Sequence, residues 1–294
     1  MTRTINPADL SVPELHGILL SSVSPRPIAF ASTIDKDGKI NLSPFSFFNV
    51  FSTNPPIMVF SPARRGRENT TKHTLDNVEE VKEVVINIVS YDMVQQMSLA
   101  SSEFPKGVNE FVKSGFTEVP SETIRPPRVK ESPVSFECKV NDIIHLGYEG
   151  GAGNLVICEV QRIHINERIL NEEGKIDPNK IDTVARMGGF WYCRASGGSL
   201  FQIPKPLTSV GIGYDNIPEK IRNSNILTGN ELGQLGNIEV LPDIESINKA
   251  RKIPEVADIL NSETKVEERL HQLAKGMLAK EQLELAWAVL LCNK

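Results

Sequence analysis

The loop from Ser61 to Leu75, SPARRGRENTTKHTL, gathers groups of the kind that bind a phosphate ester. It holds four cations and several hydroxyls before the expected start of a helix near Leu75. The cations are Arg64, Arg65, Arg67 and Lys72, and the hydroxyls include those of Ser61 and Thr74. A phosphate monoester carries nearly two charges and several acceptor oxygens, so cations, hydroxyls and backbone N–H groups bind it together. A helix start capped by threonine supplies such N–H groups. The alternative is a solvated basic loop without a ligand.

The two segments before this loop, ASTI and NLSPFSFFN, mix aromatic rings with hydroxyl and amide side chains. The rings are Phe45, Phe47 and Phe48, and the polar residues are Ser32, Thr33, Asn41, Ser43, Ser46 and Asn49. Alternate side chains of a strand share a face, so both kinds can line one groove. A planar heteroaromatic ring with a phosphate tail would use both features, which indicates flavin mononucleotide (FMN). An aromatic core with hydroxyls on its outer face is the alternative.

Strand patterns dominate residues 26–162. The β-branched runs RPIAFASTI, PPIMVF, EVVINIVS, SPVSFECKVNDIIHL and NLVICEVQRIHIN are bounded by turn residues such as Asp37-Gly38, and short helices are expected near residues 74–83 and 91–101. About six strands with antiparallel-type turns favour a closed barrel, because closure removes exposed edges. No Gly-x-Gly-x-x-Gly follows a strand, so a Rossmann domain is not supported.

The chain changes character after FQIPKPL. Pro204 and Pro206 mark a boundary, and the sequence beyond it is helical in pattern, with Val266, Leu270 and Leu273 at helical spacing. We expect a first domain over residues 1–205 and a helical C-terminal extension over residues 206–294. The apolar stripe is expected to pack against the barrel or a second subunit.

Composition excludes several classes of protein. A formal net charge of −5 argues against a nucleic-acid or membrane-surface binder. No apolar run approaches the roughly 20 residues that span a bilayer, and the start of the chain lacks the apolar centre of a secretory signal. A cytoplasmic location is therefore expected. The four cysteines form no Cys-x-x-Cys pair and the five histidines show no ligand spacing, so no metal site is predicted.

The stretch SPRPIAFASTIDKDGKINLSPFSFFNVFSTNPPIMVFSP resembles the flavin reductase-like proteins with an FMN-binding split barrel. The resemblance continues through KHTLDNVEEVKEVVINIVS and VARMGGFWYCR and covers roughly residues 10–205. It implies a mainly β fold, a six-stranded antiparallel split barrel with Greek-key connections. It also implies a homodimer with FMN near the dimer interface, and transfer of reducing equivalents from NAD(P)H to flavin, often to supply a monooxygenase.

The resemblance also implies site residues. The flavin ring and ribityl chain are expected near Arg26, Ser32, Thr33, Asn41, Ser43, Phe45 and Ser46, and the phosphate near Ser61, Arg64, Lys72 and Thr74. Arg186 and Gly188, in RMGG, are expected on the nicotinamide or substrate side. His73 stands where many relatives carry Asp. We predict no catalytic acid or base, because hydride transfer between stacked rings requires none.

Three functions fit these residues. The first is an NAD(P)H-dependent flavin reductase that releases reduced FMN. The second is an FMN-retaining electron carrier or reductase of another substrate. The third is a flavin-binding module without turnover. FMN is favoured over FAD as the cofactor, with NAD(P)H as a transient co-substrate. The sequence does not distinguish NADH from NADPH or identify the electron acceptor.

Overall fold

The computed structural model describes residues 1–203 and 210–293. The chain divides into two compact units, Met1–Phe201 and Gln202–Lys294. The boundary predicted between residues 205 and 206 lies outside the described residues. Each unit has its own hydrophobic core, and the two are described separately below.

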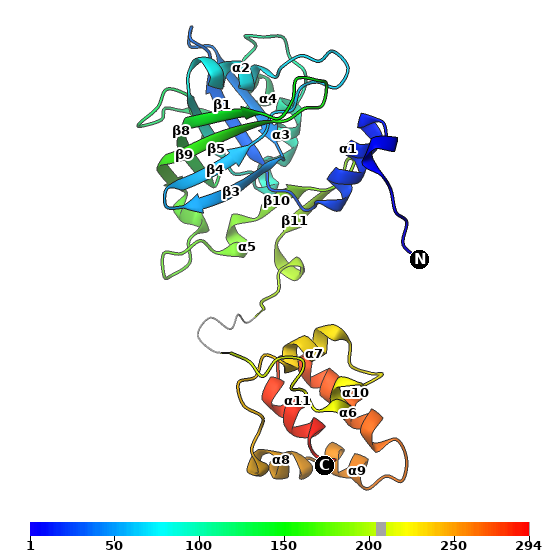
Figure 1. Cartoon of the computed structure of the whole chain (residues 1–294). Coiled ribbons are helices and arrows are strands. Elements are labelled where there is room, and N and C mark those ends of the chain that lie inside the picture. The colour runs from blue at the N-terminus through cyan, green and yellow to red at the C-terminus, as the bar shows by residue number, and fades with distance from the viewer. Residues whose placement is uncertain (204–209, 294) are drawn as a thin grey trace. The chain divides into compact units, whose positions relative to one another are not determined.

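The N-terminal unit is built on an antiparallel sheet (Figure 1). The sheet has seven strands in the order β2-β1-β5-β8-β9-β4-β3. Its strands are β1 (Ala29–Ile34), β2 (Ile40–Phe45), β3 (Phe48–Thr53), β4 (Pro56–Phe60), β5 (Glu83–Asn87), β8 (Val134–His145) and β9 (Asn154–Ile165). Two small ribbons pair β6 (Glu118–Val119) with β7 (Arg128–Val129), and β10 (Thr183–Arg186) with β11 (Tyr192–Ala195). The mainly β prediction is confirmed.

The predicted count of six strands is wrong. The segment NLSPFSFFN, expected to be one strand, turns at Ser46 and Phe47 and yields both β2 and β3. These are the two edge strands of the sheet, yet only two residues separate them, so the sheet must curl until its edges approach. Among the described residues, no strand pairing joins β2 to β3, and the predicted closure is therefore not a continuous ladder.

Both faces of β1 are buried, which explains its uninterrupted run of small and apolar residues. Ala29 and Ala31 pack into one core cluster, while Ile28 and Phe30 pack into another. The helix α2 contributes to the first cluster, and α3 and α4 contribute to the second. The helices of this unit are α1 (Val12–Ser22), α2 (His73–Glu80), α3 (Val94–Ala100), α4 (Glu110–Ser114) and α5 (Pro178–Ile181).

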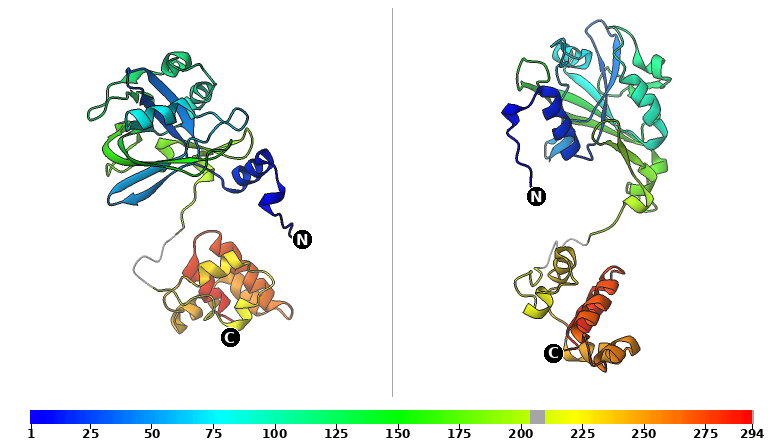
Figure 2. Two further views of the ribbon diagram at one scale, coloured as in Figure 1. Left: turned by 45° about the horizontal axis from the view of Figure 1, so that its top comes forward. Right: turned by 90° about the vertical axis from the view of Figure 1, so that its right-hand side faces the viewer.

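The described part of the C-terminal unit is helical. Its helices are α6 (Glu219–Arg222), α7 (Gly229–Leu235), α8 (Ile244–Arg251), α9 (Pro254–Leu260), α10 (Val266–Leu278) and α11 (Leu283–Leu290). The helices α10 and α11 pack against each other (Figure 2, orange and red). Trp287 is fully buried at the centre, and its indole N–H donates to the Leu235 carbonyl at 3.0 Å. No helix in the described ranges is long and apolar enough to cross a membrane.

Candidate functional site

A polar cavity of about 30 Å³ lies beside β2 and the start of α2. Four residues predicted for the flavin site line it together, namely Asn41, Ser43, Lys72 and Thr74. The opposite wall is the segment after α3, with Ser101, Ser102, Glu103 and Phe104. A water needs roughly 10–15 Å³ of such space, so the cavity suits a small anion such as phosphate rather than a flavin ring.

Hydrogen bonds between β1, β2 and α2 fix the inner wall of this cavity. The Asn41 amide donates to the Thr74 hydroxyl at 2.9 Å, and the Asn77 amide donates to the Thr33 hydroxyl at 3.1 Å. Asn41 and Thr33 are themselves partners in the β1–β2 ladder. The start of α2 is therefore locked to the sheet, and Lys72, its N-cap residue, is held at the cavity.

Two cations converge on one carboxylate at the cavity. Glu103 Oε1 lies 3.3 Å from Arg65 Nε and 3.5 Å from Lys72 Nζ. Lys72, followed by the hydrogen bonds from Arg65, lowers the pKa of the Glu103 carboxyl. Arg65 also donates to the Thr70 hydroxyl and the Thr71 carbonyl, which orient its guanidinium. This end of the cavity therefore brings two cationic side chains together.

Two further titratable groups line the cavity, His73 and Glu110. Burial, followed by the charge of Arg65, lowers the pKa of His73, so its ring is neutral at pH 7. Burial raises the pKa of Glu110, whose carboxylate accepts from the Leu42 N–H at 2.9 Å. Burial therefore favours the neutral form of the Glu110 carboxyl group, which lines the cavity.

Ser61 and Arg64 lie in a different group from Lys72. The Ser61 hydroxyl accepts from the Asn154 N–H at 3.0 Å, which attaches the loop to the start of β9. The Arg64 backbone N–H donates to the Ala152 carbonyl at 2.8 Å, and its guanidinium donates to Asn69. These contacts shape the loop that presents Arg65 and Lys72.

Arg26, Ser46 and Arg186 form a third group. The buried Arg26 guanidinium donates to the Val23 carbonyl at 2.8 Å, to the Met187 carbonyl at 3.0 Å, and to the Ser46 hydroxyl at 3.4 Å. Arg26 also exchanges backbone hydrogen bonds with Arg186. Arg26 thus joins the end of α1 to the β10 ribbon.

Gly188 lies where this ribbon meets α1. A Cβ built at Gly188 would come within 2.3 Å of the Ser21 hydroxyl oxygen, so the close approach requires glycine. The nearby Arg186 guanidinium stacks over the Tyr192 ring at 4.6 Å. Gly188 is therefore needed for packing, whatever ligand lies beside it.

Ser32 and Phe45 are the remaining predicted residues. Phe45 is almost fully buried, with its ring centre 5.4 Å from that of Phe60, so it belongs to the core of the sheet. Ser32 is buried too, and its hydroxyl has no hydrogen-bond partner among the described residues.

The sequence analysis assigned Arg64 rather than Arg65 to the phosphate and did not include Glu103, whereas Arg65 and Glu103 line the cavity. Arg65 was visible as the neighbour of Arg64 in the run ARRGR, but only the loop backbone decides which arginine faces the cavity. The segment SSEF at residues 101–104 carried no local signal, because it reaches the cavity through tertiary packing.

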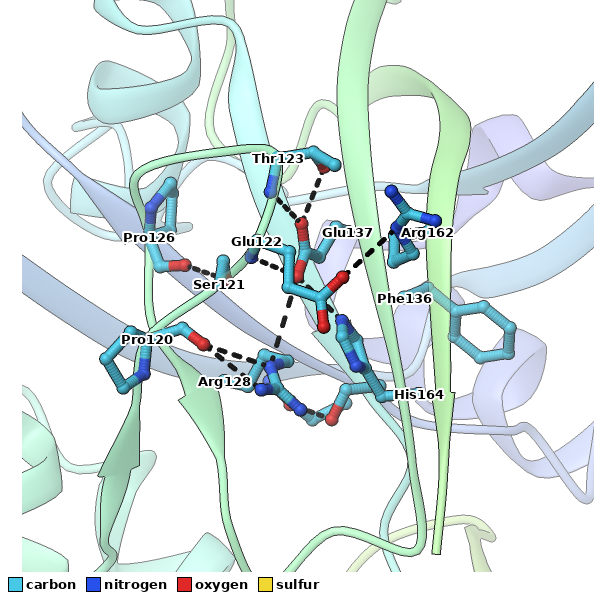
Figure 3. A network of polar contacts seen from close by, with 12 residues as sticks. Pro120, Ser121, Glu122, Thr123, Pro126, Arg128, Phe136, Glu137, Arg162 and His164 are labelled. Carbon is cyan, nitrogen blue, oxygen red and sulfur yellow. Dashed lines mark hydrogen bonds and ion pairs between the residues drawn. The ribbon is translucent and has the colours of Figure 1, made fainter.

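A second polar cluster surrounds Glu137, which is completely buried on β8 (Figure 3). One carboxylate oxygen accepts from the Glu122 N–H and from His164 Nε2, and the other accepts from the N–H and hydroxyl of Thr123. A carboxylate offers about four lone-pair positions, and all four are used. No capacity remains for a substrate, so this cluster holds the loop over residues 120–127 in place.

Comparison with known proteins identifies relatives of most of the chain. The family model described as the flavin reductase like domain matches residues 20–179. An uncharacterized protein of Aquifex aeolicus is 39% identical over 183 residues, which are 62% of this chain and 91% of that protein. The uncharacterized protein BH2278 of Halalkalibacterium halodurans is 34% identical over 207 residues, covering 70% of this chain and 97% of its own.

Solved structures resemble the same share of the chain. Nitrilotriacetate monooxygenase component B from Bacillus cereus has a TM-score of 0.64 at 29% identity, covering 69% of this chain and 99% of its own. The 2-nitrobenzoate 2-nitroreductase NbaA of Pseudomonas fluorescens has a TM-score of 0.61 at 28% identity, covering 71% and 100%. A Shewanella frigidimarina protein with a split barrel domain has a TM-score of 0.57 at 27% identity, covering 67% and 95%.

Proposed function

The chain belongs to the flavin reductase-like family, and we propose that it binds FMN and transfers a hydride from NAD(P)H to that flavin. The observation that carries the proposal is the anion site where Arg65 and Lys72 meet the hydroxyls of Ser43 and Thr74. A phosphate distinguishes FMN from riboflavin, and cations with hydroxyls are the groups that recognise a phosphate.

The residues present fit a phosphate because Arg65 and Lys72 already bind an anionic group, the carboxylate of Glu103. The Glu103 carboxylate contacts both cations, so its oxygen stands in for a phosphate oxygen. Lys72 and Arg65 are assigned to the phosphate by charge, and Ser43 and Thr74 by their hydroxyls. Asn41 and Thr33 position this wall by hydrogen bonding.

The protein's task in this reaction is to bind and orient. When bound, the flavin supplies the ring that accepts a hydride and passes reducing equivalents on. We assign the unpartnered hydroxyl of Ser32 to the flavin side, and Arg186 with Gly188 to the side where a nicotinamide or substrate docks. No residue is assigned as a general acid or base.

Retention of FMN for reduction of another substrate is the second candidate. The similarity to a protein named as a nitroreductase favours it, whereas the similarity to a monooxygenase component favours delivery of reduced flavin to an oxygenase. NAD(P)H oxidation that rises with added free FMN supports delivery. A protein that keeps about one flavin per chain through purification supports retention. Failure to bind FMN at micromolar concentration in calorimetry contradicts both.

We also propose a homodimer, because the N-terminal unit leaves apolar surface uncovered. None of the residues of α1 is buried, and its Leu19 is 50% exposed. On β3, Phe51 is 68% exposed. Apolar surface of this kind is covered in symmetric dimers. Light scattering at micromolar concentration is expected to give twice the monomer mass, and a monomer mass would reject the dimer.

Glu103→Gln is expected to strengthen FMN binding by about two- to fivefold, the range typical of one exposed ion pair. The carboxylate and the phosphate compete for Arg65 and Lys72, so the neutral amide frees both cations. Glutamine keeps the size of the side chain. Fluorescence titration measures the affinity, with riboflavin as the control ligand because it has no phosphate. Weaker FMN binding by the variant would show that Glu103 orients the cations instead of competing for them.

A further inference from the structure

The C-terminal unit contains a cavity of about 140 Å³ between α6, α10 and the end of α11. Its wall is largely apolar and includes Pro218, Ile221, Leu270, Leu290 and Leu291. An apolar cavity of about 150 Å³ holds a molecule the size of benzene. The space therefore suits a ligand with a single ring.

One polar group of this wall, His271, is deeply buried, with 4% of its surface exposed. Its Nδ1 lies 2.7 Å from the Ser224 hydroxyl oxygen. That oxygen already accepts from the N–H groups of Ile226 and Leu227, both at 3.1 Å. A hydroxyl oxygen has two lone pairs and one proton, so the Ser224 proton must be donated to His271 Nδ1.

The tautomer of His271 follows from this arrangement. Burial lowers the pKa of His271, although Glu267 opposes the effect, and the ring is neutral at pH 7. With Nδ1 acting as an acceptor, the ring proton sits on Nε2. Among the hydrogen bonds of the described residues, none uses Nε2. Nε2 is not among the buried side-chain atoms of the described residues that lack a partner, so it faces accessible space, and its N–H is free to donate to an acceptor in the cavity that His271 lines.

The charges around the cavity define that acceptor. Glu219 and Glu267 line it together with a single cation, Lys220, so an anionic ligand is disfavoured. We propose that this cavity binds a small neutral molecule with one ring and one carbonyl or hydroxyl oxygen, which accepts the hydrogen bond from His271 Nε2. The lining residues all belong to the C-terminal unit, and the proposal does not rest on the proposed flavin function.

The test uses the full-length protein and two probes of equal shape. Cyclohexanone carries the acceptor oxygen, and methylenecyclohexane has a CH2 group in its place. We expect cyclohexanone to bind with a dissociation constant on the order of 1 mM or below. In protein with 15N-labelled histidine, it should shift the Nε2–H resonance of His271. Methylenecyclohexane should leave that N–H without a new hydrogen bond.

Two variants complete the test. His271→Phe should weaken cyclohexanone binding at least fivefold while leaving methylenecyclohexane binding unchanged. Ile221→Phe fills the cavity and should abolish binding of both probes, which keeps the test decisive if His271→Phe does not fold. Absence of cyclohexanone binding to the wild-type protein at 10 mM, roughly tenfold above the expected constant, would overturn the proposal. An unshifted Nε2–H resonance in the bound state would overturn it as well.

Discussion

Replacing Lys72 by alanine is expected to weaken FMN binding by roughly 10- to 150-fold. The charge-assisted hydrogen bond that Lys72 would make to phosphate contributes about 1.5–3 kcal/mol, which corresponds to that range. Lys72 makes no side-chain hydrogen bond at the N-cap of α2, and its ion-pair partner Glu103 is exposed, so we expect the variant to fold. Calorimetric or fluorescence titration of the variant and the wild-type protein measures the loss.

Two controls separate phosphate recognition from general damage. Riboflavin has the same ring without the phosphate, so Lys72→Ala should change riboflavin affinity little. Arg67→Ala removes an exposed cation from the same loop that does not line the cavity, and FMN affinity should change little in that variant. An equal loss for both flavins, or no loss for FMN, would reject the phosphate assignment.

Thr74 is less suited than Lys72 to a test of phosphate recognition by mutation. Its hydroxyl accepts a hydrogen bond from the Asn41 amide, so Thr74→Val leaves a buried amide without an acceptor. Loss of FMN affinity in that variant would combine a direct effect with a local change in structure. Lys72 has no such partner in the core.

The sequence predicted those parts of the site that local patterns control. Lys72 and Thr74 are close in sequence, one at the N-cap and the other in the first turn of α2, and the change from basic loop to amphipathic helix marks the helix start. Asn41 and Ser43 are separated from them by about thirty residues, but period-2 alternation puts both on one face of β2. The contact of α2 with the first two strands then brings the four residues together.

The sequence could not predict features that depend on tertiary packing or on a single backbone turn. Glu103 reaches Lys72 only because α3 and α4 pack against β2. Arg64 and Arg65 have the same side chain, and their different partners, Asn69 and Glu103, follow from the course of the loop. The turn at Ser46 divides one expected strand into two. Its residues, Ser46 and Phe47, include no glycine or asparagine, so no strong turn signal predicts it.

Phe45 shows the limit of reasoning from residue type. An aromatic ring beside serines is compatible both with a flavin contact and with the core of a sheet, so residue type does not distinguish the two. The structure places the ring against Phe60 inside the sheet. Burial on one face of a curled sheet depends on the curvature, which strand periodicity alone does not determine.

Glu137→Gln is expected to lower the free energy of unfolding of the N-terminal unit by roughly 3–5 kcal/mol, the cost of removing one partner from a buried charged cluster. The new amide would point N–H groups at donors that now bind a carboxylate, including the N–H groups of Glu122 and Thr123. Urea denaturation followed by far-ultraviolet circular dichroism measures the loss. Because Trp191 belongs to the N-terminal unit, Trp287 fluorescence is followed in a Trp191→Phe background, where it reports the C-terminal unit, which should be unchanged.

Glu122→Gln is the matched control for this variant. Glu122 belongs to the same loop, but its carboxylate pairs at the surface with Arg162 at 3.4 Å, and more than half of its side chain is exposed. An exposed pair contributes about 0–1 kcal/mol, so this variant should be close to the wild-type protein. Equal losses of unfolding free energy in the two variants would mean that replacing the buried Glu137 carboxylate costs no more than replacing the exposed carboxylate of Glu122.

The stability that Glu137 provides is expected to disappear in acid. Burial alone would raise the pKa of Glu137, but hydrogen bonds from Thr123, from the backbone and from His164 outweigh it and hold the pKa at about 2, against an ordinary value of 4.5. This difference corresponds to about 3 kcal/mol. Because the folded-state pKa is depressed, the contribution is complete above pH 4.5 and is lost as the pH falls toward 2. Glutamine does not titrate, so the wild-type protein and Glu137→Gln should converge in stability across this window. A gap between them that stays constant from pH 6 to pH 3, roughly the range that spans the ordinary carboxyl pKa, would contradict the depressed pKa.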